Sequence, residues 1–247
     1  MSNGAPNPVK EHADGSFVTT RWSLVVRAGG GHTEGRRALD ELCRMYWYPL
    51  YCYARRRELQ HADAEDAVQG FFLRLLKKDL FGKADRDKGR LRAFLLSSLQ
   101  DYLVDEHRRA TAEKRGGRAE FVPLDTTGAE ERYRAEPVDT DTPEKHFERG
   151  WALMVLQRTA AALREGWKKS GKSELFATLS PYLFTPLDAS GTQRLATERR
   201  MTESNVKVSL HRLRESYRNL LRSEIAETVA TESEIDAELA ALRSAVS

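Results

Sequence analysis

The segment Met201–Arg222 constrains the fold more than any other, because its apolar residues recur at helical spacing. Four of them lie four, three and four positions apart and therefore share one face of a helix. They are Val206, Leu210, Leu213 and Tyr217. Between and just after them stand the basic side chains Lys207, His211, Arg212, Arg214 and Arg218. The segment is therefore predicted to bury one side against a core and to present cations on the other.

A second short amphipathic segment, Gln193–Arg199, lies just upstream of this helix. Thr202 stands where a helix N-cap is expected, since its hydroxyl can accept a hydrogen bond from the first turn. Two short helices joined by a tight turn, the second apolar inside and basic outside, are what a DNA-reading helix-turn-helix requires. A basic helix that is merely solvated and packed on a core is the alternative that this window leaves open.

Charge is divided unevenly at the C-terminal end of the chain. Residues 194–222 contain eight Arg or Lys against three acids, a net +5, whereas residues 223–247 contain six acids against one Arg, a net −5. The whole chain carries only +3, so the distribution is more informative than the total. It predicts a phosphate-binding segment followed by an acidic tail, which either folds back on the basic helix or remains a solvated helix.

Several classes of protein are excluded by composition. The only two cysteines, Cys43 and Cys52, lack metal-ligand spacing and the six histidines are scattered, so no metal site, cofactor or disulfide framework is expected. No apolar run approaches the roughly 18 residues of a membrane span, and no signal peptide is recognisable. We therefore expect a cytoplasmic protein with no membrane span, its cysteines reduced.

Apolar residues recur at helical spacing through most of the chain, and no β-pattern of any length is found. The predicted fold class is all-α, with two small helical bundles joined by a flexible linker and a helix-turn-helix in the C-terminal bundle. Pro49 is expected to bend or split its helix, and Asp63 to cap the next one. The predicted segments are a flexible lead with a short docking segment (1–34), the first bundle (35–110), the linker (111–146), the second bundle (147–222) and an acidic helical tail (223–247).

Three segments, in this order, resemble bacterial RNA polymerase sigma factors of the extracytoplasmic-function type. Region 2.2 of that family is similar to DAEDAVQGFFLRLL at 63–76, and its regions 2.3 and 2.4 to RLRAFLLSSLQDYLVDEHRR at 90–109. The recognition half of its region 4.2 is similar to MTESNVKVSLHRLRESY at 201–217. The resemblance covers roughly residues 35–110 and 147–222. It implies a transcription initiation factor, not an enzyme, that recognises −35 and −10 promoter elements and helps to melt DNA.

The resemblance also implies partners and the residues that contact them. Core RNA polymerase, through its β′ clamp and β flap, is one partner and promoter DNA is the other, while an anti-sigma factor or a regulatory kinase stays open. The polymerase-binding residues would be Asp63, Glu65, Asp66, Gln69 and Arg74. The −10 element would be held by Lys83, Arg86, Lys88, Arg90, Arg92, Arg108 and Arg109. The −35 element would be read by Ser204, Asn205, Lys207, Val208, Ser209, His211, Arg212, Arg214 and Arg218.

The chain departs from the family pattern at four positions. Phe94 stands where the family usually has Trp, and we predict that it packs in the core rather than stacks on a base. Gln100 and Asp101 replace the usual Arg and Asn, and Arg200 replaces the glycine that is usual in the turn.

Three other functions are alternatives to this one. A stand-alone helix-turn-helix regulator would bind duplex DNA as a homodimer without polymerase, but it leaves the 63–76 segment without a role. A magnesium-dependent nuclease would use Asp63, Glu65 and Asp66 with Asp85 and Asp87, yet the last two lie among cations and no nucleophile or base accompanies them. A purely helical adaptor does not explain the basic helix.

Overall fold

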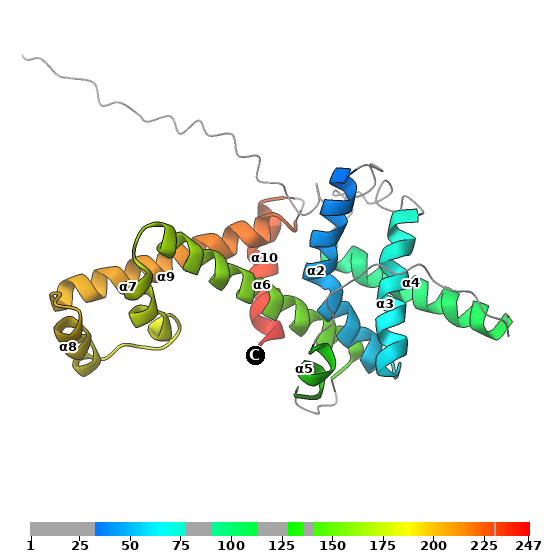
Figure 1. Cartoon of the computed structure of the whole chain (residues 1–247), viewed down its shortest axis with the longest axis horizontal. Coiled ribbons are helices and arrows are strands. Elements are labelled where there is room, and N and C mark those ends of the chain that lie inside the picture. Colours follow the sequence, from blue (N-terminus) through cyan, green and yellow to red (C-terminus); the bar gives the residue numbers. More distant parts are fainter. Residues whose placement is uncertain (1–32, 78–89, 113–127, 136–140, 230) are drawn as a thin grey trace, which may run out of the picture.

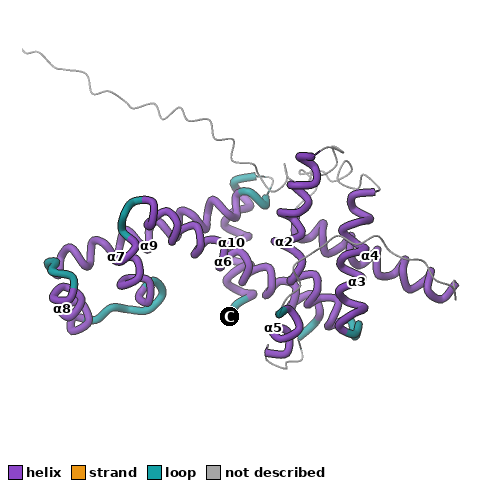
Figure 2. Tube along the Cα trace, in the orientation of Figure 1, coloured by secondary structure: helices purple, strands orange, loops and turns teal. Residues whose placement is uncertain are grey.

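The computed structural model describes residues 33–77, 90–112, 128–135, 141–229 and 231–247. All regular structure in these residues is helical, and Figure 2 shows the helices joined by loops without any strand in this part of the chain. The predicted all-α fold class is therefore confirmed. In chain order the helices are α2 (Thr33–Arg56), α3 (His61–Lys77), α4 (Leu91–Ala112), α5 (Ala129–Ala135), α6 (Pro143–Lys169), α7 (Ser173–Leu179), the 3-10 turn η2 (Ser180–Tyr182), α8 (Ala189–Glu198), α9 (Glu203–Ala226) and α10 (Ser233–Ala245).

The described helices form an elongated arrangement. Figure 1 shows α7 and α8 at one end and α3 and α4 at the other, with α6 and α9 running side by side between them. Both long helices therefore contribute to the packing at each end of the molecule.

Helices α2 and α6 cross in close contact near the middle of the molecule. Pro49 lies inside α2 and has no N–H to donate to the preceding turn, yet the helix continues from Thr33 to Arg56 as one element. Opposite it stands Gly150 of α6, where an added Cβ would lie 3.1 Å from the Pro49 Cα. The missing side chain at Gly150 thus allows the two backbones to approach. Of the two alternatives predicted for Pro49, a bend or a split, the split is excluded.

The larger hydrophobic cluster, called the large core here, gathers residues from distant parts of the sequence. Helices α2, α3 and α4 provide most of it, including Tyr46, Phe72 and Leu95. Phe94 packs partly buried against this cluster, as predicted. Helix α5, the first half of α6, the end of α9 and α10 complete it.

The boundary predicted at residue 147 does not separate two packing units. Helix α6 begins at Pro143, where Thr142 caps it by accepting a hydrogen bond from the Lys145 N–H. Phe147 and Trp151 of this helix are fully buried in the large core. The same uninterrupted helix then carries Leu163 into the second cluster, so no linker separates the two.

The second cluster, called the distal core, contains the apolar face predicted for residues 201–222. Val206, Leu210, Leu213 and Tyr217 are all buried, which confirms the helical spacing. Their partners come from α6, α7 and α8 and include Leu163, Leu179 and Leu195. Leu156 and Leu221 pack against both clusters, so α6 and α9 link them.

The acidic C-terminal segment adopts neither of the two arrangements considered for it. Helix α9 extends to Ala226, and α10 follows and packs against α6 and the end of α9. Ile235 and Leu242 of α10 enter the large core. The tail therefore docks beside the start of α4 and leaves the basic surface of α9 exposed.

Substitution of Gly150 tests the crossing of α2 and α6. Gly150→Ala is expected to destabilise the protein by about 1–2 kcal/mol, because overpacking against the Pro49 backbone exceeds the gain in helix propensity. Gly166→Ala in the same helix is the control, since nothing lies within 4 Å of the added Cβ, and it should stabilise by about 0.5–1 kcal/mol. Urea unfolding followed by circular dichroism measures both. Equal stabilisation by the two substitutions would contradict this account.

Candidate nucleic-acid interface

Helices α8 and α9 each begin with a side-chain N-cap, and the connection between them is short. Asp188 caps α8 by accepting a hydrogen bond from the Gly191 N–H at 2.8 Å, and Thr202 caps α9 by accepting one from the Asn205 N–H at 3.2 Å. The predicted capping role of Thr202 is confirmed. Between the helices, the Met201 N–H donates to the Ala196 carbonyl at 2.9 Å and closes the turn.

Arg200 in this connection has a φ of +51°, in the left-handed region that favours glycine. The turn therefore keeps the conformation for which glycine is best suited, although a side chain is present. The neighbouring Arg199 fastens the turn to α7: its Nη1 lies 2.9 Å from the Glu174 carboxylate and its Nε donates to the Thr178 hydroxyl at 2.7 Å. This role of Arg199 was not predicted from the sequence, because the contacts join residues more than twenty positions apart.

Most residues assigned to the −35 element lie on the exposed side of α9. Ser204, Val208 and His211 stand opposite the buried face of the helix, while Lys207 and Arg212 flank them on either side. All five are exposed, and the Val208 side chain is 43% accessible. Asn205 and Arg218 are also exposed. The surface thus has the apolar Val208 among polar side chains at its centre, with cations at its edges.

Two residues of the predicted −35 set are placed differently. Arg214 is half-buried, and its Nη2 donates to the carbonyls of Tyr182 and Thr185 at 2.8 and 2.9 Å. Its guanidinium therefore holds the loop before α8, and the prediction that it meets phosphate does not fit this arrangement. Ser209 is half-buried and, with Arg212, lines a hollow of about 610 Å³ between α6, α7 and α9.

The residues assigned to polymerase binding lie on α3. Asp63 and Asp66 are exposed, whereas Glu65 and Gln69 are half-buried. Asp63 lies in the first turn and does not cap the helix, because α3 begins at His61. Arg74 connects α3 to α4, since its Nη2 lies 2.6 Å from the Asp105 carboxylate and its guanidinium stacks over the Tyr102 ring.

The residues assigned to the −10 element are divided by the structure. Lys83, Arg86 and Lys88 lie outside the described residues. Arg108 and Arg109 are exposed near the end of α4, about 24 Å along the helix axis from its first turn. Arg90 and Arg92, at the start of the same helix, are instead engaged by acids from α6 and α10.

Arg92 is the centre of a buried ionic cluster. Its Nε and Nη2 donate to the two carboxylate oxygens of Glu238 at 2.6 and 3.1 Å, and Nη1 pairs with Glu148. Its guanidinium carbon lies 4.5 Å from the centroid of the Trp151 ring. Arg90 pairs with Glu238 as well, at 3.1 Å. The side chain of Arg92 is 8% exposed and that of Glu238 is inaccessible, so the prediction that Arg92 faces a DNA backbone does not hold in this arrangement.

Burial and the neighbouring charges act against each other on the ionisable groups of this cluster. Burial acts against the charge on Arg92, but the hydrogen bonds and charges of Glu238 and Glu148 outweigh it and raise the pKa of the guanidinium. Burial raises the pKa of the Glu148 carboxyl, and the charge on Glu238 adds to this effect while Arg92 opposes it. Two carboxylates and two guanidiniums thus form a locally neutral group.

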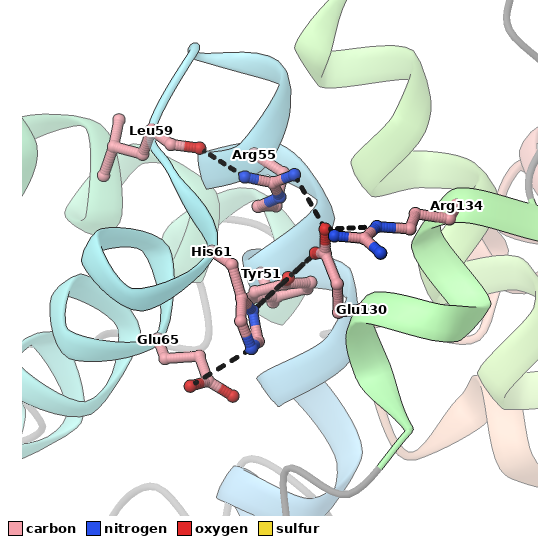
Figure 3. Close-up of polar contacts among 7 residues, drawn as sticks. All are labelled: Tyr51, Arg55, Leu59, His61, Glu65, Glu130 and Arg134. Carbon is pink, nitrogen blue, oxygen red and sulfur yellow. Dashed lines mark hydrogen bonds and ion pairs between the residues drawn. The ribbon is translucent and has the colours of Figure 1, made fainter.

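A second polar cluster fixes α5, which lies within the segment predicted to be a flexible linker. Glu130 accepts hydrogen bonds from the Tyr51 hydroxyl at 2.5 Å, from Arg55 at 3.1 Å and from Arg134 at 3.0 Å (Figure 3). The Nδ1 of His61 lies 2.9 Å from the same hydroxyl. The signal for this helix was present in the sequence, because acids follow Gly128 in the first turn and bases occupy the last.

Comparisons with known protein families, with curated proteins and with solved structures find no match to this chain. Within the described residues, none of the helices combines the length and apolar character needed to cross a lipid bilayer. His, Cys, Asp and Glu side chains in this part of the chain nowhere gather in a group of three that could hold a metal ion. Asp85 and Asp87 of the nuclease alternative lie outside the described residues.

A substitution at Arg200 tests whether its positive φ strains the turn between α8 and α9. Arg200→Gly is expected to stabilise the protein by up to about 1 kcal/mol, because glycine adopts positive φ without a Cβ penalty. Arg200→Ala keeps the Cβ and should leave the stability near that of the wild type. Thermal unfolding of the three proteins distinguishes these cases, and a glycine variant no more stable than the alanine variant would show that the turn is unstrained.

Docking of α5 should depend on pH through Glu130. Burial acts to raise the pKa of this carboxyl, but the Tyr51 hydrogen bond and the charge on Arg55 outweigh it and hold the pKa below its ordinary value of 4.5. The contribution to stability is therefore complete above pH 4.5 and is lost as the pH falls through the folded-state pKa.

Accordingly, Glu130→Gln should destabilise the protein by about 1–2 kcal/mol at pH 7, and the difference from the wild type should shrink below pH 4.5. Urea unfolding at a series of pH values measures it. Glu131→Gln, at the exposed neighbouring position, is the control and should differ little from the wild type at any pH. A Glu130→Gln effect that persists unchanged at acid pH would refute the ionic role.

Proposed function

We propose that the protein is a transcription initiation factor that binds bacterial core RNA polymerase, recognises −35 and −10 promoter elements and helps to melt DNA. In this proposal α8 and α9 form a helix-turn-helix, with α9 as the recognition helix in the major groove. The α2–α4 unit, with its exposed α3 face, engages the polymerase. Such a protein acts in the bacterial cytoplasm and performs no covalent chemistry.

The observation that carries the proposal is the exposed face of α9. Ser204, Val208 and His211 form its centre, while Lys207 and Arg212 lie at its edges, and the opposite face of this part of the helix is buried in the distal core. Side chains in the centre are suited to base edges, and Val208 is suited to the methyl group of thymine. Lys207 and Arg212 are suited to guanine or to the flanking phosphates.

The polymerase contacts follow from the surface that α3 leaves open. Asp63 and Asp66 present exposed carboxylates on one end of α3, beside the half-buried Glu65 and Gln69. Acids in this position fit a basic partner surface such as the β′ clamp. Arg74 would support this face from within by holding α3 against α4. The β flap would bind near the distal core.

A stand-alone duplex-binding regulator is the second candidate, and one observation favours it. Arg92 is buried, whereas the α9 surface is open. In this arrangement the chain is better prepared to bind double-stranded DNA through α9 than to hold a separated strand at the start of α4.

The two candidates are separated by a selection experiment with the purified chain. The chain is mixed with bacterial core RNA polymerase and a pool of random duplex DNA, and both polymerase binding and the start sites of transcripts are measured. The proposal expects a stable complex and initiation downstream of a common pair of motifs. Binding of duplex DNA to the chain alone, with no effect on the polymerase, would instead support the regulator.

Substitutions on α9 test the recognition surface. Lys207→Ala combined with Arg212→Ala should lower promoter binding by the holoenzyme at least tenfold and reduce its salt dependence, because two cations leave the DNA surface. Lys168→Ala combined with Lys169→Ala removes the same charge from the exposed end of α6 and serves as the control. An equal loss of promoter affinity in both double variants would mean that the cations of α9 act only through the overall charge of the protein.

A further inference from the structure

The arginines at the start of α4 form a cradle for an anion. Two nitrogens of Arg92 and the Nε of Arg90 converge on the carboxylate of Glu238, at distances of 2.6 to 3.1 Å. The Trp151 ring supports the guanidinium of Arg92 from its flat face. A phosphate group offers a guanidinium the same forked arrangement of oxygens as a carboxylate. The cradle is therefore suited to a nucleic-acid backbone once Glu238 is absent.

The charge of the cradle depends on Glu238. With Glu238 present, Arg90 and Arg92 are balanced by Glu238 and Glu148. Without it, Glu148 still orients Arg92 through Nη1, and the remaining group carries one net positive charge. Removal of a single carboxylate thus converts a neutral cluster into an oriented site for anions.

The element that carries Glu238 is held at this position by several contacts. The Leu91 N–H, at the start of α4, donates to the carbonyl of Thr228 at 3.3 Å. Arg222 of α9 pairs with Asp236 of α10 at 2.6 Å, and Ile235 and Leu242 lie in the large core. Figure 1 shows α10 lying against α6 near the middle of the molecule. We call α10 together with Thr228 the latch.

We propose that the latch is an intramolecular competitor of single-stranded nucleic acid, with the Glu238 carboxylate occupying the place of a backbone phosphate between Arg90 and Arg92. This inference rests on the proposed function, because it takes the strand that the latch excludes to be the −10 strand separated during promoter melting. The isolated chain then binds a separated strand poorly, and release of α10 makes the cradle available. Duplex contacts on α9 are unaffected, because that surface lies outside the latch.

The test uses the full chain without polymerase and a fluorescent single-stranded oligonucleotide of about 20 nucleotides. Glu238→Gln keeps the size of the side chain and removes its charge, and it should tighten binding about tenfold in an anisotropy titration at low salt. Glu232→Gln makes the same change of charge at an exposed position and should alter the affinity less than twofold. Equal affinities for the wild type and Glu238→Gln would overturn the proposal.

A second variant tests whether a gain in oligonucleotide affinity arises at the cradle. Arg92→Ala added to Glu238→Gln should return the affinity to the wild-type level or below, since the phosphate loses its main partner. A gain that survives this substitution would overturn the proposal, because the strand would then bind elsewhere.

Hydrogen exchange on the wild-type chain needs no substitution and covers the case in which a variant fails to fold. Saturating oligonucleotide should accelerate amide exchange in residues 233–245, because the strand displaces α10. Binding that leaves this exchange unchanged would refute the latch.

These results are distinguishable from those on the proposed function. A chain that redirects polymerase but gains nothing from Glu238→Gln would refute the latch alone. A chain that gains affinity through Glu238→Gln but never binds polymerase would refute the initiation factor and leave the latch standing.

Discussion

The contact between Pro49 and Gly150 determines how the rest of the chain can pack. Because the backbones of α2 and α6 approach at this point, Phe147 and Trp151 reach the large core and seal it. Trp151 in turn supports the guanidinium of Arg92, and the ion pairs of Arg92 receive α10. The close approach at Gly150 is therefore the first of a series of contacts that ends at α10. Few of these contacts join residues that are close in sequence.

Local features of the fold were predictable from the sequence, whereas long-range ones were not. The buried face of α9 and the cap at Thr202 followed from spacing and residue type, and both are present. The docking of α5 and the extension of the large core into α6 escaped prediction. Each depends on partners far away in the sequence, as Glu130 does on Tyr51, and helical periodicity carries no information about such partners.

The candidate site illustrates the same limit for arginine. Exposed Arg212, half-buried Arg214 and buried Arg92 belong to segments of similar composition, yet one is presented to solvent, one binds loop carbonyls and one is enclosed by acids. A guanidinium can satisfy its donors with carbonyls, carboxylates or phosphates. Sequence alone therefore gives the chemistry that an arginine is capable of, and the surrounding fold decides which acceptor it meets.

The uninterrupted course of α6 has a consequence for the geometry of the two ends of the molecule. This helix of 27 residues spans about 40 Å, and α9 runs beside it. The two ends are therefore joined by a pair of packed helices rather than by a flexible linker. A single residue inserted midway along α6 would rotate the residues beyond it by about 100° about the helix axis and break their register with α9. The angular phase between the two ends is thereby set by helical pitch, in the same way that the pitch of a duplex sets the direction in which successive grooves face.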